Sequence, residues 1–131
     1  MNARRPENDM KLLTQDTAAS AGVLTVANDI DVQTLDLTGV QRIDLVFPKF
    51  ADGRAFSQAF ELRRRLGFAG VIRATGDVLV DQLLQMQRCG FSEALLRADQ
   101  DLAVGERLLR QFSGFYQGDA TDLRPHFAKA A

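Results

Sequence analysis

Residues 43–48, Ile-Asp-Leu-Val-Phe-Pro, and residues 71–77, Val-Ile-Arg-Ala-Thr-Gly-Asp, are the two stretches that decide the fold. The first is a nearly continuous apolar run closed by a proline, which suits a buried strand. In the second, residues 71–74 are predicted to form a strand, and Gly76 and Asp77 are predicted to open a helix with Asp77 as its N-cap. Both stretches therefore indicate a strand followed directly by a helix.

The helix predicted after the first strand lies between Gly53 and Gly67, a glycine that ends it. Helical spacing divides its residues into two faces. The face expected to pack on the sheet carries Phe56, Ala59, Phe60, Arg63 and Leu66. The face expected to meet water carries Ser57, Gln58, Glu61, Arg64 and Arg65.

The rest of the chain fits one domain flanked by two tails. Residues 1–20 are polar and are predicted to be a mobile arm, residues 21–116 a single α/β domain, and residues 117–131 a C-terminal tail. Further strands are expected at 23–27 and 94–96, and residues 32–40 suit a short strand or an extended connector. A third helix is expected between Asp101, its cap, and Gly114.

A weak internal repeat supports this reading, with an offset of about two dozen residues. The recurring pairs are Gly67-Phe68 with Gly90-Phe91, Arg73-Ala74 with Arg97-Ala98, and Asp77 with Asp101. We therefore predict successive βα units that form a small, mainly parallel sheet, half-barrel-like or open and three-layered, with helices packed on the sheet.

Simple strand order would place all three helices on one face of this sheet. The other face then needs the N-terminal strands, a curling of the sheet or a second subunit to cover it. Because a small sheet has edges and a face to protect, we expect a homodimer or a higher oligomer.

Composition excludes several classes of protein. The 131 residues carry a net charge of -1, which gives no bias toward nucleic acid or an anionic membrane. No apolar run approaches the roughly 20 residues that span a bilayer, so we expect a cytoplasmic protein. Cys89 and His126 are the single cysteine and histidine, which argues against a metal site, and Cys89 is expected to be a buried structural thiol. The nucleotide-binding glycine motifs are absent, so no cofactor is predicted.

Polar residues follow the predicted strands, where ligands bind in parallel α/β sheets. The candidate ligand-binding residues are Gly53, Arg54, Ser57, Arg73 and Gly76. Because guanidinium groups match oxyanions with two hydrogen bonds, the arginines point to a small oxyanion. Asp52, Asp77 and Asp81 are the candidate general bases if the protein is an enzyme. The alternative interpretation is structural: the aspartates cap helices, the glycines shape turns and the arginines form ion pairs.

Several of these residues also carry a resemblance to a known family. The matching segments are Phe47–Ser57, Gly70–Leu79, Asp81-Gln82 and Arg88–Phe91. They resemble an uncharacterised bacterial family, domain of unknown function nine hundred and thirty-four, over about residues 22–116. Its members are encoded beside sulfite reductase and are labelled oxidoreductases of sulfite reduction, so the resemblance implies a link with sulfate assimilation.

Three hypotheses follow. The first is an accessory protein of assimilatory sulfite or sulfate reduction that binds sulfite reductase or a small oxyanion through its strand-to-helix loops. The second is a cofactor-less enzyme that acts on an anionic substrate with an aspartate as general base. The third is a structural oligomerisation module.

Overall fold

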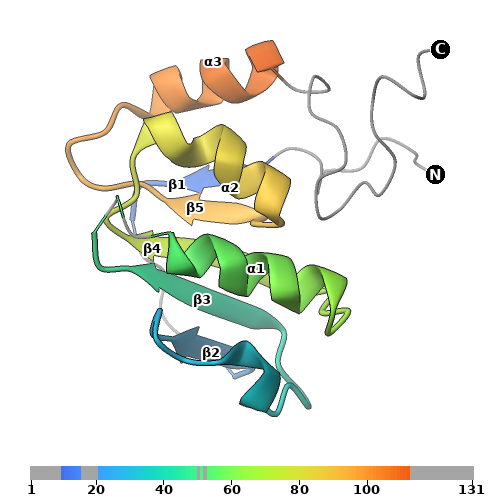
Figure 1. The fold of residues 1–131 in the computed structure, drawn as a ribbon. Coiled ribbons are helices and arrows are strands. Elements are labelled where there is room, and N and C mark those ends of the chain that lie inside the picture. The colour runs from blue at the N-terminus through green and yellow to red at the C-terminus, as the bar shows by residue number, and fades with distance from the viewer. Residues whose placement is uncertain (1–9, 16–20, 50, 52, 113–131) are drawn as a thin grey trace, which may run out of the picture.

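A five-stranded sheet in which every neighbouring pair is parallel forms the centre of the protein (Figure 1). The computed structural model describes residues 10–15, 21–49, 51 and 53–112. Its strands are β1 (Lys11–Leu13), β2 (Val23–Val26), β3 (Arg42–Phe47), β4 (Val71–Gly76) and β5 (Glu93–Leu95), in the spatial order β1-β5-β4-β3-β2. The predicted α/β fold with a mainly parallel sheet is confirmed.

Three α-helices lie on the same face of this sheet (Figure 1). They are α1 (Arg54–Arg64), α2 (Leu83–Cys89) and α3 (Leu102–Phe112). Two short 3-10 helices complete the elements: η2 (Val32–Thr34) lies between β2 and β3, and η3 (Val80–Gln82) lies between β4 and α2. Because β2, β3, β4 and β5 follow one another across the sheet, right-handed crossovers place their connections on one side. The described residues thus form two layers, the sheet and the helices on one of its faces.

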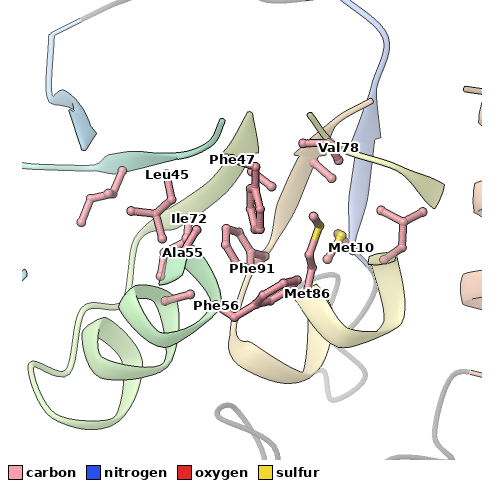
Figure 2. Packing of buried hydrophobic residues seen from close by; sticks show 14 of the residues in the cluster. Met10, Leu45, Phe47, Ala55, Phe56, Ile72, Val78, Met86 and Phe91 are labelled. Atoms are coloured by element: carbon pink, nitrogen blue, oxygen red, sulfur yellow. The ribbon is translucent and has the colours of Figure 1, made fainter. Parts of the chain in front are cut away.

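The hydrophobic core fills the space between the sheet and the helices. Ile43, Leu45 and Phe47 alternate along β3 and are buried there, as the period of a strand requires. Phe47 meets Phe56 of α1 edge to face, with ring centroids 5.1 Å apart, and its ring lies 5.7 Å from that of Phe91 (Figure 2). This aromatic cluster joins β3, α1 and the segment after α2.

The prediction that residues 1–20 form a mobile arm is wrong for residues 11–13. These residues form β1, which pairs with β5, and the backbone N–H of Leu96 donates to the carbonyl of Leu13 at 2.8 Å. Met10 beside it is buried in the core. The N-terminal strands therefore extend the sheet at its two edges and do not cover the face opposite the helices.

Two assignments on α1 are also wrong. Gln58 was expected to face water but is only 6% exposed, because its Nε2 donates to the carbonyls of Ala27 and Ile30, each at 2.9 Å, in the turn after β2. Phe60 was expected in the core but is 40% exposed, with the Arg64 guanidinium 5.2 Å from its ring centroid. Because the turn after β2 packs against α1, the buried face of this helix includes Gln58 and leaves Phe60 exposed.

The second βα unit also departs from its prediction. Strand β4 continues to Gly76, and Asp77 does not cap a helix, because η3 precedes α2 and α2 begins only at Leu83. Asp101 does cap α3, since its Oδ1 accepts the backbone N–H of Ala103 at 2.9 Å. The aspartate positions of the internal repeat are therefore not equivalent in structure.

Candidate functional site

The candidate site lies at the carboxyl end of the sheet, where β3 ends and α1 begins (Figure 1). The N-cap of α1 is Gly53, which offers no side chain to cap the helix, and the first turn contains no acidic residue. The first helical residue is Arg54, and Ser57 follows one turn later; both are exposed. Lys49, in the loop before the helix, is exposed as well. This end of α1 combines the positive end of the helix dipole with two cationic side chains.

Arg73 lies elsewhere: it is inside the strand predicted over residues 71–74 and not in the loop that follows it. It sits within β4, and because its neighbours Ile72 and Ala74 face the helices, its side chain belongs to the opposite face of the sheet. There its Nε donates to Glu93 Oε1 at 2.8 Å, and the residue is only 4% exposed. Arg73 therefore does not join Arg54 at the end of the sheet.

Arg73 belongs instead to a row of charged residues that crosses the helix-free face. The strand register aligns Asp44 with Arg73, Arg73 with Glu93, and Glu93 with Lys11. A second ion pair joins Arg42 Nε to Asp44 Oδ1 at 2.8 Å. Charge thus alternates from strand to strand, which favours this register over one that places like charges opposite each other. Nothing in the sequence indicates that Asp44 and Glu93 are the residues aligned with Arg73 in this row.

Asp77 is part of a second group of charges, after β4 and β5. The Arg97 guanidinium donates to Asp77 Oδ1 and, at 2.6 and 2.8 Å, to the two carboxylate oxygens of Asp99. The hydrogen bond from Arg97 lowers the pKa of Asp99 to about 2, and the bonds to Asp99 and Asp77 raise the pKa of Arg97. A carboxylate held in this way favours its charged form and is a weak general base.

We expect the Asp99 carboxyl to titrate near pH 2, and to return toward its ordinary value of 3.8 in Arg97→Ala. Because the pKa of Asp99 is depressed in the folded state, its ionisation favours folding above pH 3.8, and this contribution is lost as the pH falls toward 2. Since this group is exposed, its effect on total stability is expected to be small. NMR titration of the side-chain carboxyl measures the shift.

The control for this titration is Arg110→Ala on α3, which removes the same charge without removing a hydrogen bond to Asp99. A normal Asp99 pKa in the wild type, or an equal change in both variants, would contradict the assignment.

The remaining candidates are scattered. Asp52 lies outside the described residues, Asp81 is exposed in the first turn of η3, and Gly76 ends β4. Cys89 is the last residue of α2 and is half-buried. Gly53, Arg54 and Ser57 are thus the predicted site residues that the structure brings together. Within the described ranges, no group of histidine, cysteine and acidic residues is arranged to hold a metal ion.

The fold and this site define a small parallel α/β protein with a cationic helix N-terminus at the carboxyl end of its sheet. The chain belongs to the family described as bacterial protein of unknown function (DUF934), whose model matches residues 22–127. Neither the comparison with curated proteins nor that with solved structures gave a match. None of the helices in the described segments is long and apolar enough to cross a membrane.

Proposed function

We propose that this protein binds a small oxyanion of the sulfite or sulfate class at the N-terminus of α1, as a cytoplasmic accessory protein of assimilatory sulfite reduction. The observation that carries the proposal is the position of Arg54 as the first residue of a helix without a side-chain cap. An anion bound at this end of α1 would meet the positive end of the helix dipole beside the Arg54 guanidinium. Backbone N–H groups, the guanidinium and the Ser57 hydroxyl would then supply donors from one side.

The link to sulfite reduction rests on the family resemblance and not on the geometry. A tetrahedral or pyramidal oxyanion suits a helix N-terminus whatever its central atom, so phosphate is the comparison that tests selectivity. Sulfite reductase is the proposed macromolecular partner. Co-purification of the two proteins from an extract, with an unrelated tagged protein as control, tests that part separately.

Replacing Arg54 with alanine is expected to weaken oxyanion binding about tenfold or more, since a hydrogen bond to a charged group contributes roughly 1.5–3 kcal/mol. Isothermal titration calorimetry at pH 7 with sulfite, sulfate and phosphate measures the change. Ser57→Ala should weaken binding less, because it removes one neutral donor.

Arg65→Ala is the matched control, because it removes the same charge from the other end of α1, where the residue is the C-cap. If no oxyanion binds the wild type at millimolar concentration, the proposed site does not exist. An equal loss in Arg54→Ala and Arg65→Ala would indicate a general charge effect in place of a site.

The enzyme alternative has less support from the described residues. It needs an aspartate that is held in a partly closed pocket and is not spent on an ion pair, whereas Asp77 is hydrogen-bonded to Arg97 and Asp81 is exposed to solvent. We also propose that the chain forms a homodimer, since the open sheet leaves an unpaired edge at β2 among the described strands.

A further inference from the structure

The outer edge of β2 is the feature that identifies a surface for self-association. Strand β2 stands at one end of the sheet and, among the described strands, pairs only with β3 (Figure 1). An unpaired strand edge presents backbone donors and acceptors that can bind another strand.

Hydrogen bonding to β3 settles the direction of these groups. The backbone N–H of Arg42 donates to the carbonyl of Gly22 at 3.1 Å, so the peptide groups of Gly22 face β3. In a parallel ladder every second residue turns its N–H and C=O to the same neighbour. Leu24 and Val26 therefore follow Gly22 toward β3, and the N–H and C=O groups of Val23 and Thr25 point outward.

The sequence of β2 lacks two features that block edge pairing, namely charged side chains and proline. Its four residues, Val-Leu-Thr-Val, include no charged residue and no proline. The opposite edge strand, β1, has three residues and contains the exposed Lys11. Three of the four side chains of β2 are β-branched, which also favours strand pairing. Ile30, in the turn that follows β2, is 41% exposed and adds apolar surface near this edge.

We propose that β2 pairs in antiparallel orientation with β2 of a second copy of this chain, so that the sheet continues across the dimer. A two-fold axis at Leu24 places Val23 of one copy opposite Thr25 of the other. The two residues of each such pair can exchange both of their outward hydrogen bonds. An edge with this arrangement is complementary to itself, which is what a two-fold interface requires. A second copy of the same chain is therefore an occupant that fits this edge.

Thr25→Pro tests this pairing directly. Proline at Thr25 removes an outward N–H and leaves the ladder to β3 intact, and proline is tolerated at edge positions of this kind. Light scattering coupled to gel filtration, at micromolar protein, is expected to give the wild type twice the chain mass of 14.5 kDa. Thr25→Pro is expected to give the mass of a single chain, with an unchanged circular dichroism spectrum.

Thr25→Val is the matched control, since it alters the same side chain but keeps the backbone N–H, and it should remain dimeric. A monomeric wild type, or a folded Thr25→Pro variant that stays dimeric, would overturn the proposal. If Thr25→Pro fails to fold, amide hydrogen exchange of the wild type tests the interface instead. The amides of Val23 and Thr25 should be protected and should lose protection on dilution, whereas fast exchange at all concentrations would exclude the interface. These readouts are independent of oxyanion binding.

Discussion

Replacing Gly76 with alanine is expected to lower the free energy of unfolding by about 4 kcal/mol, from the sum of two costs. Gly76 has a φ of +94°, a region that residues with a Cβ rarely occupy. A Cβ at this position would also lie 2.4 Å from the carbonyl oxygen of Phe47 and 3.1 Å from its carbonyl carbon. The obstacle is backbone of the neighbouring strand β3, so it cannot move aside as a flexible side chain would. Urea denaturation followed by circular dichroism measures the loss.

Alanine variants of two other glycines measure separately the backbone strain and the steric clash that Gly76→Ala combines. Gly39 has a φ of +77° with no atom within 4 Å of an added Cβ, so Gly39→Ala should cost only the backbone strain, about 1 kcal/mol. Gly70 has no positive φ, but its added Cβ would lie 2.4 Å from the carbonyl oxygen of Gln41. Gly70→Ala thus reports the clash. A loss in Gly76→Ala no larger than that in Gly39→Ala would show that β3 and β4 do not approach as closely as described.

This close approach also bears on the role of Gly76 at the candidate site. The backbone N–H of Asp77 donates to the carbonyl of Phe47 at 2.8 Å, so the contact between the strands continues past Gly76. Packing alone therefore explains the glycine, and no ligand is needed to account for it. The proposed oxyanion site rests instead on Arg54, the first residue of α1.

Replacing Arg63 with alanine is expected to destabilise the protein by about 3 kcal/mol, because several carbonyl groups would lose a charged donor at once. The Arg63 guanidinium donates to the carbonyls of Phe68, Gly70 and Gly90, at distances between 2.7 and 2.9 Å. It therefore ties the end of α1 to the segment that enters β4 and to the end of α2. Burial lowers the pKa of Arg63, and these acceptors compensate for the lost solvation.

Arg64→Ala is the control for Arg63→Ala, since the neighbouring side chain is exposed and contacts only the ring of Phe60 among the interactions described. Its expected effect is within about 0.5 kcal/mol. Arg63→Lys should recover little of the loss, because an ammonium group cannot reach three diverging carbonyls from one position. Equal stability of Arg63→Ala and Arg64→Ala in urea denaturation would contradict the role given to Arg63.

Residue patterns were sufficient to predict the central part of the fold. Apolar runs near β3 and β4, each ended by proline or glycine and followed by helical spacing, indicated parallel βα units because these signals are local. Gly67 was predicted to end its helix, and it has a positive φ just after α1. Gly90, its partner in the internal repeat, has a positive φ just after α2. Gly53, Arg54 and Ser57 were placed correctly at the start of α1 for the same reason.

The N-terminal strand could not be predicted, because its evidence is not local. Residues 11–13 form β1 only through pairing with β5, which lies far along the chain. A run of three residues carries too little periodicity to indicate a strand by itself. The buried amide of Gln58 was missed for a similar reason, since its partners are carbonyl groups of a turn that packs on α1 only in the folded chain.

The position of Arg73 shows most clearly where sequence reasoning ends. The sequence by itself determined that a strand begins near Val71 and that a turn follows at Gly76, and hence that Arg73 lies close to the end of that strand. Only the tertiary structure decided that β4 continues to Gly76, because the pairing of Gly76 with Phe47 fixes its length. Because side chains alternate along β4, Arg73 lies on the face opposite Ile72 and Ala74, where Glu93 of β5 binds it. Local residue patterns determine which elements form, whereas the register between strands, set by contacts across the sheet, determines which charged groups meet.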